Sequence, residues 1–342
     1  MNLKELSSQL GLSQTTVSRA LNGYPEVSES TRQRVMAAAE QFHYAPSTRA
    51  KGLATGKALA IGHVIPTTKS HEMVNPIFAD FIAGAGEEYA RQGYEMILSV
   101  LNNDEDEHRV YQNLKSRRAV DGVVVHAPKM DDPRIPLLKD LDLPFVVHGR
   151  ASGVSLPYSW LDVNNRSAFH RATGFLYDLG HRRMALLNGN EQMDFAMRRR
   201  RGFVDALTDR GITADPTLMH ADEMTEDFGY LTTREMLAQD APPTAILTSS
   251  MIIALGVRRA VEESGLKMGR DVSIITHDDR LSYLRNGGDV PIFTATRSSV
   301  RDAGRQLAAM LLQIIAEPDK NPMQTLLEAE LTVGQSTGPA PR

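Results

Sequence analysis

Short apolar runs alternate with stretches of helical periodicity from residue 59 onward. Between the runs, apolar residues recur every three or four positions, as in Phe78, Phe81, Ile82 and Ala85, which predicts helices. Buried strands separated by helices predict parallel sheets in one large or two smaller α/β units, with ligands at the carboxyl ends of strands. The predicted strands are 59–65, 94–100, 122–126, 144–149, 184–189, 244–249, 272–277 and 292–296.

The residues before position 45 follow a different pattern, that of three short helices. Leu3, Leu6 and Leu10 lie on one helical stripe, and Ser13 is placed to cap a second helix that runs to about Asn22. A third helix is expected to bury Val35, Ala38 or Ala39, and Phe42. This order is that of the helix-turn-helix motif, in which two helices joined by a short glycine-containing turn are followed by a supporting helix.

The outer face of the second helix lacks acidic residues. It presents Gln14, Thr15, Thr16, Ser18 and Arg19. Phosphates repel acids, whereas glutamine and arginine bond base edges and threonine bonds phosphate or contacts a thymine methyl. The face therefore suits a helix that enters the major groove of DNA; a small helical protein-binding head is the alternative.

Charge is distributed unevenly along the chain, whose net charge is −4. Residues 1–57 hold seven basic and four acidic residues, a surplus of +3, and the other 285 residues carry 31 basic and 38 acidic ones. A basic head on an acidic body fits a nucleic-acid partner for the head alone.

Composition and motifs exclude several classes of protein. The 342 residues, 42% of them hydrophobic, are typical of a globular protein of two or three domains. The absence of cysteine excludes disulfides, thiolate metal sites and a cysteine nucleophile. Neither a membrane-spanning run nor a signal peptide is recognisable, so we expect a cytoplasmic protein.

Familiar catalytic motifs are missing as well. The segment 52–57 is one residue short of a P-loop, and Gly84 and Gly86 do not follow a strand as a dinucleotide site requires. The ten histidines are scattered without an HExxH pattern, and no G-x-S-x-G elbow is present. The sequence thus predicts no metal, no cofactor and no enzymatic activity.

The stretch LSQTTVSRALNG…VSESTRQRV…HYAPSTRAKGLATG closely resembles the head of the lactose-repressor/galactose-repressor family of bacterial transcription factors. The resemblance implies a DNA-binding head over 1–45, whose second helix reads the major groove through Gln14, Thr15 and Arg19. It also implies a hinge over 46–57 that becomes helical on DNA and inserts Leu53 into the minor groove. The full set of expected DNA contacts is Ser13, Gln14, Thr15, Thr16, Arg19, Asn22, Arg49 and Leu53.

For residues 58–342 the resemblance implies an effector-binding and dimerisation domain of two parallel α/β subdomains, like a periplasmic sugar-binding protein. The first is expected over about 58–160 and 293–320, and the second over about 161–292 and 321–342. The final segment TVGQSTGPAPR has no leucine heptads, so a homodimer rather than a tetramer is expected.

Several positions are candidate effector contacts. At least one arginine of the run 198–201 points inward, because it precedes the apolar face of Phe203, Ala206 and Leu207; the resemblance selects Arg199. Asp278 ends a strand and matches the family's effector-binding aspartate, with a helix cap as its alternative role. Phe78 matches an aromatic over the ligand ring, with a place in the core as its alternative. The expected set is Asn75, Phe78, Arg150, Arg199, Met224, Ser250 and Asp278.

The resemblance is greatest to repressors of α-glucoside uptake and breakdown. It implies a regulator, expected to be a repressor, that binds pseudo-palindromic operator DNA and whose affinity for it is set by a gluco-configured sugar. Departures around 249–252, 276–279 and 294–298 indicate an effector different from the commonest ones. Three alternatives remain: a nucleoside- or purine-responsive regulator of the corepressor type, a sugar-acting enzyme, and a binding protein without DNA activity.

Overall fold

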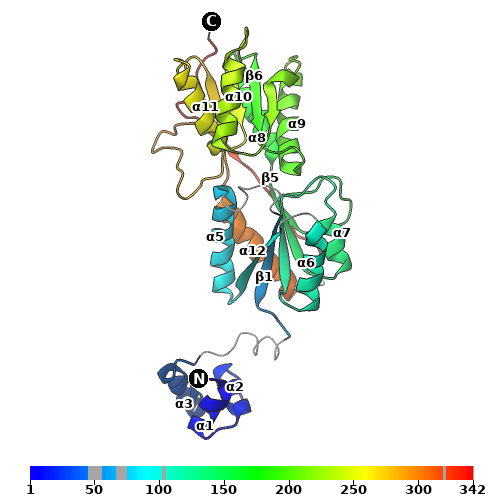
Figure 1. The fold of residues 1–342 in the computed structure, drawn as a ribbon, viewed down its shortest axis with the longest axis vertical. Coiled ribbons are helices and arrows are strands. Elements are labelled where there is room, and N and C mark those ends of the chain that lie inside the picture. Colours follow the sequence, from blue (N-terminus) through cyan, green and yellow to red (C-terminus); the bar gives the residue numbers. More distant parts are fainter. Residues whose placement is uncertain (45–55, 67–74, 102–104, 319–320, 342) are drawn as a thin grey trace. The chain divides into compact units, whose positions relative to one another are not determined.

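The computed structural model describes residues 1–44, 56–66, 75–101, 105–318 and 321–341 (Figure 1). They form two compact units, Met1–Leu59 together with Arg118–Val120, and the rest of the chain. Arg49 and Leu53 of the expected hinge lie outside the described residues. No helix within the described ranges is long and apolar enough to cross a membrane.

The head consists of helices α1 (Leu3–Leu10), α2 (Gln14–Leu21) and α3 (Glu29–Gln41). Their start signals are local: Asn2 and Glu5 form a capping box on α1, while Ser13 and Ser28 cap α2 and α3. Leu6, Val17 and Val35 are fully buried at their meeting point.

One helix position in the head differs from the prediction. Phe42, expected in the core, follows the end of α3 and is 36% exposed. Tyr44 packs against the core cluster instead. The helix ends one residue before Phe42, so the periodicity that predicted its burial no longer applies there.

The first subdomain of the body is built on a parallel six-stranded sheet of order β11-β5-β4-β3-β1-β2. Helices α5 (Pro76–Arg91) and α12 (Val300–Ala316) pack together over one face, and α6 (Glu105–Ser116) and α7 (Arg134–Asp140) cover the other (Figure 1). The strands are β1 (Ala60–Pro66), β2 (Glu95–Leu101), β3 (Gly122–His126), β4 (Phe145–His148), β5 (Trp160–Val163) and β11 (Gln324–Leu327).

The second subdomain repeats this plan with the strand order β12-β10-β9-β8-β6-β7, in which only the pairing of β12 with β10 is antiparallel. One core cluster lies under α8 (Asn165–Asp178) and α9 (Asp194–Thr208), another under α10 (Glu226–Leu237) and α11 (Met251–Glu263). The strands are β6 (Met184–Asn188), β7 (Met219–Ala221), β8 (Ala245–Thr248), β9 (Ser273–Asp278), β10 (Thr294–Arg297) and β12 (Glu330–Thr332), with a short 3-10 helix at Pro216–Leu218.

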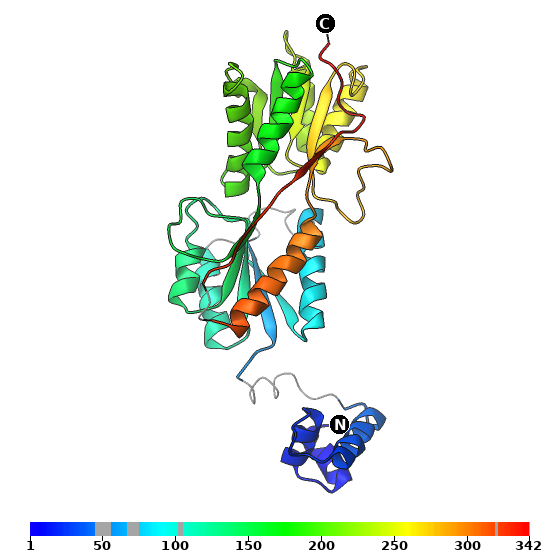
Figure 2. The same ribbon diagram turned by 180° about the vertical axis from the view of Figure 1, so that it is seen from behind.

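The chain passes between the subdomains three times: after β5, between β10 and α12, and between β11 and β12 (Figure 2). The crossings thus fall a few residues after the expected positions near 160, 292 and 320. The reason is strand pairing: β10 continues the second sheet beside β9, and β11 adds to the first sheet beside β5. Both strands therefore belong to the subdomain opposite to the one expected.

Candidate functional site

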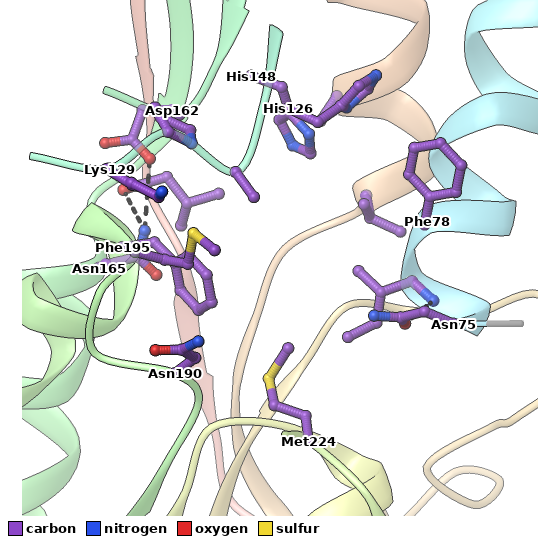
Figure 3. A pocket seen from close by; sticks show the side chains of 18 of the residues that line it. Asn75, Phe78, His126, Lys129, His148, Asp162, Asn165, Asn190, Phe195 and Met224 are labelled. Carbon is purple, nitrogen blue, oxygen red and sulfur yellow. Dashed lines mark hydrogen bonds between the residues drawn. The ribbon is translucent and has the colours of Figure 1, made fainter. Parts of the chain in front are cut away.

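A cavity of about 740 Å³ lies where the two subdomains face each other, at the carboxyl ends of their strands. Parallel strands leave their connecting loops at this edge, which is where α/β folds bind ligands. Figure 3 shows Phe78 on one side of the cavity, with Asn165 and Phe195 across from it. The residues come from both subdomains, so a ligand here would contact both.

Arg199 supplies a buried cation in this cavity. Its Nε donates to Asn165 Oδ1 at 2.7 Å and its Nη1 donates to the carbonyl of Ser249 at 2.6 Å. The guanidinium carbon lies 5.0 Å from the ring centre of Phe195 and 5.2 Å from that of Phe169. Burial lowers the pKa of Arg199 to about 10, so the side chain remains charged at neutral pH.

Asp279 is one of the carboxylates that line the cavity, and its charge acts on Arg199. Burial raises the pKa of Asp279 to about 7, and the charge of Arg199 opposes the rise. His277 also adjoins this carboxylate, with its Nε2 at 3.5 Å from Asp279 Oδ1. Burial holds the pKa of His277 well below its ordinary value, so its ring is neutral and Asp279 is not neutralised by it.

Asp278, the expected contact, is oriented differently from its neighbour. It is 2% exposed; Oδ1 accepts from the backbone N–H of Arg280 at 2.8 Å and Oδ2 accepts from Arg297 Nε at 3.1 Å. The described residues that line the cavity do not include it. At a strand end, consecutive side chains point to opposite sides, which explains why Asp279 faces the cavity and Asp278 does not.

Two further expected contacts also lie outside the described lining. Ser250 is buried and caps α11 by accepting from the N–H of Ile253. Arg150 donates to Asp162 Oδ2 at 2.7 Å and lies over the ring of Trp160. Asp162 itself lines the cavity, so Arg150 touches the site only through this partner.

The structure brings together Asn75, Phe78, Arg199 and Met224, which all line the cavity. Asn75 caps α5 by accepting from the N–H of Ile77 at 3.0 Å. This cap fixes the first turn of the helix, from which Phe78 projects towards the cavity (Figure 3).

Two histidines of the wall were missed by sequence reasoning. His126 and His148 end the neighbouring strands β3 and β4 in direct register. Phe78 meets His126 edge-on at 5.1 Å, and His148 stacks on Phe81 at 4.1 Å. Because ligands bind at the carboxyl ends of strands, the position of each histidine as the last residue of a buried run was the available clue.

In the head, the side chains expected to meet DNA lie on or beside α2. Gln14, Thr15 and Arg19 are exposed and unobstructed within the described head. Thr16 and Asn22 are engaged locally: Ser13 Oγ and Thr16 Oγ1 lie 2.8 Å apart, and Asn22 Nδ2 donates to the Ser18 carbonyl at 2.9 Å. The face thus combines exposed polar side chains with side chains that are hydrogen-bonded at the helix ends.

Known proteins resemble the chain over both of these regions. Residues 2–47 match the family described as bacterial regulatory proteins, lacI family, and residues 58–333 match periplasmic binding proteins and sugar binding domain of LacI family. The regulator AglR of Rhizobium meliloti is 45% identical over all of this chain and 95% of its own length. RafR of Escherichia coli is 36% identical over 92% of each chain.

Solved structures agree with this assignment. A transcriptional regulator CelR–cellobiose complex is 26% identical, covers 98% of this chain and 99% of its own, and superposes with a TM-score of 0.72. The lac repressor dimer bound to operator and the anti-inducer ONPF is 24% identical and shares the fold, with a TM-score of 0.86 over 99% of each chain. The chain therefore belongs to the LacI family of transcriptional regulators, proteins with a helix-turn-helix DNA-binding head and a sugar-binding-type body, and it is not an enzyme.

Proposed function

We propose that this regulator is a cytoplasmic homodimeric repressor of a carbohydrate-utilisation operon, released from its operator by an α-glucoside, a gluco-configured disaccharide or glucose derivative. The observation that carries the proposal is the cavity between the two subdomains, lined by a buried arginine and a carboxylate, in a chain that also has a DNA-binding head.

The lining of the cavity supports a sugar as the effector. Arg199 donates and Asp279 accepts, and both retain polar atoms for hydroxyl groups, which are donors and acceptors at once. Phe78 offers an apolar ring to the C–H face of a pyranose. In this proposal Asp279 takes the place that the sequence suggested for Asp278, and Asn75 and Met224 complete the contact surface.

The size of the cavity supports a ligand of more than one ring. At about 740 Å³ it is in the middle of the range of small-molecule sites. A relative over nearly the full chain, CelR, was solved as a complex with cellobiose, a gluco-configured disaccharide. Resemblance of the present sequence to α-glucoside repressors selects the α-linkage.

On DNA, Gln14, Thr15 and Arg19 would read base edges while Ser13, Thr16 and Asn22 approach phosphates. Arg49 and Leu53 would act from the hinge, on the backbone and in the minor groove. Two heads on one dimer would match two half-sites of a pseudo-palindromic operator. Leu98 and Val100, 43% and 47% exposed on the edge strand β2, support pairing of two bodies.

Effector and operator would communicate through the body. A ligand that touches both subdomains stabilises one angle between them, and that angle sets the spacing of the two hinges in a dimer. A hundredfold loss of operator affinity requires about 2.7 kcal/mol of coupling, and the operator must weaken sugar binding by the same factor.

A purine-responsive corepressor is the second candidate, because the aromatic wall of Phe78, His126 and His148 also suits a planar base. Thermal unfolding of the full chain with maltose, sucrose, trehalose, cellobiose, guanine or hypoxanthine separates the two. We expect an α-glucoside to raise the unfolding temperature and the purines to leave it unchanged. Stabilisation by purines alone would overturn the proposed effector class.

A further inference from the structure

Two asparagines lie close together where β6 leads into α9, and their amide groups are bonded differently. Asn188 is fully buried, and its Nδ2 donates to Glu191 Oε1 at 3.0 Å and to the carbonyl of Ala196 at 2.9 Å. Asn190 is partly exposed and lines the cavity, into which its side chain projects (Figure 3). Of the two, Asn190 is therefore the one whose amide group a ligand in the cavity can reach.

Backbone groups fix the orientation of the Asn190 amide. Its Oδ1 accepts from the N–H of Gln192 at 3.0 Å, and its carbonyl accepts from the N–H of Met193 at 3.0 Å, so one tight turn holds its backbone and its side chain. The NH₂ group of the planar amide points away from this turn. Within the described chain Nδ2 has no hydrogen-bond partner and is not one of the buried unpaired atoms, so its N–H groups are exposed.

Asn75 repeats this arrangement in the other subdomain. Its Oδ1 accepts from the N–H of Ile77 at the start of α5, which leaves Nδ2 as the group available to a ligand. Figure 3 shows Asn75 and Asn190 on opposite sides of the cavity. An amide nitrogen donates and does not accept, so the parts of a ligand that meet these two side chains must carry acceptor atoms.

We propose that Asn190 is a specificity-determining residue that donates from Nδ2 to an oxygen atom of the effector, across the cavity from the donor of Asn75. The inference rests on the proposed sugar effector for the identity of that oxygen, which would be a hydroxyl, ring or glycosidic oxygen. Because each subdomain supplies one donor, an effector that accepts from both would hold the subdomains together. A ligand with only C–H or ammonium groups at these points would leave both amides unpaired and bind less well.

Asn190→Asp separates the donor role from a part in the turn alone. Aspartate keeps an oxygen that accepts from the N–H of Gln192 but has no N–H to donate, whereas Asn190→Ala loses both functions. For the sugar among maltose, sucrose and trehalose that binds the wild-type chain, we expect calorimetry to show about tenfold weaker binding by both variants. Unchanged operator binding without sugar shows that each variant is folded. Sugar binding by Asn190→Asp that is as tight as in the wild type, or tighter, would overturn the donor role.

Side-chain amide NMR of the ¹⁵N-labelled full chain gives a second readout, with Asn188 as the matched control. Saturation with the sugar should shift the Nδ2–H signals of Asn190 and Asn75. The signals of Asn188 should shift much less, because its Nδ2 is already bonded to Glu191 and Ala196. Asn190 signals that do not respond to a sugar that binds would overturn the contact.

Failure of the proposed effector would be seen separately. If guanine or hypoxanthine binds the wild-type chain and none of the sugars does, the sugar proposal is wrong. The same variants then test the donor on the purine, whose carbonyl oxygen is an acceptor, so Asn190→Asp should again weaken binding about tenfold. A purine that binds this variant as tightly as the wild type would overturn the donor role as well.

Discussion

Arg199 Nε donates to Asn165 Oδ1 at 2.7 Å, and this hydrogen bond ties the cation of the cavity to the first residue of the helix that follows a crossing between the subdomains. Asn165 in turn donates to the carbonyl of Val163, at the end of β5. The position of the guanidinium is therefore set by the same few residues that define the angle between the subdomains. In the proposed mechanism, a ligand bound to Arg199 would act on that angle.

Replacing Arg199 with methionine should abolish the response to sugar while operator binding persists. The side chain keeps its bulk but loses charge-assisted hydrogen bonds, so we expect sugar affinity to fall about ten- to hundredfold. Calorimetry measures the affinity, and a gel shift measures the operator complex.

The matched control is Arg200→Met on the same helix, because Arg200 pairs with Glu191 at 3.0 Å and lies outside the described cavity lining. It should bind sugar like the wild type. Equal losses in the two variants would mean that Arg199 has no special place in the site.

Asp279→Asn should stabilise the ligand-free protein, and more so at high pH. Its pKa is about 7 in the folded chain against an ordinary 3.8, so between these values the folded state holds a proton that the unfolded state has lost. Stability therefore falls as pH rises through this window, by at most about 4 kcal/mol above pH 7. Asparagine avoids this penalty. Urea midpoints at pH 5 and pH 8 measure the difference, which should be larger at pH 8.

The neighbouring variant Asp278→Asn distinguishes the two aspartates. Asp278 accepts from Arg280 and Arg297, so its loss should destabilise the strand end but preserve sugar affinity. Asp279→Asn should instead lose sugar affinity. The reverse pattern would restore the assignment that the sequence suggested and would place Asp279 outside the contact surface.

Arg19→Ala should weaken binding to the cognate operator by about 1–3 kcal/mol, provided that Arg19 reads a base edge. Lys4→Ala, on the exposed face of α1, serves as the comparison and should cost much less. Fluorescence anisotropy with operator and random DNA gives both affinities. The same loss on random DNA would reassign Arg19 to a phosphate.

Gly84→Ala should destabilise the body by about 1–3 kcal/mol through overpacking. A Cβ at Gly84 would fall well inside contact distance of the Arg301 carbonyl, where α5 and α12 cross. Gly86→Ala on the same helix is the control: its Cβ would meet only Met96 Cε at 3.6 Å, and alanine favours the helix by about 0.5–1 kcal/mol. The unfolding temperature should fall for Gly84→Ala and rise for Gly86→Ala. An equal loss of stability in the two variants would argue against the close crossing of α5 and α12.

The elements that could be predicted from the sequence are those with a strong local pattern. Buried runs such as Gly122–His126 and Met184–Asn188 became central strands, because both faces of a parallel sheet are covered and nearly every position is apolar. Four short strands were not predicted, namely Trp160–Val163, Met219–Ala221, Gln324–Leu327 and Glu330–Thr332. They are three or four residues long and partly exposed, so long-range pairing rather than local pattern makes them strands.

The same limit applies to the cavity. The apolar face of its helix indicated that at least one arginine of the run 198–201 points inward, and the family resemblance selected Arg199. Asp278 and Asp279, by contrast, are adjacent, and only the strand end decides which one faces inward. His63 and His126 are far apart in the sequence, and the histidines looked scattered. Parallel pairing of β1 with β3 places them within hydrogen-bond distance.

Operator binding by the full chain, followed by fluorescence anisotropy while an α-glucoside is added, tests the coupling of cavity and head most directly. A fragment from the promoter region of the chain's own genomic neighbourhood supplies the operator. We predict tight binding that weakens at least tenfold with maltose, sucrose or trehalose in the wild type and stays constant in Arg199→Met. The coupling would be contradicted by one result: calorimetry shows that one of these sugars binds, yet operator affinity is the same with and without each of them.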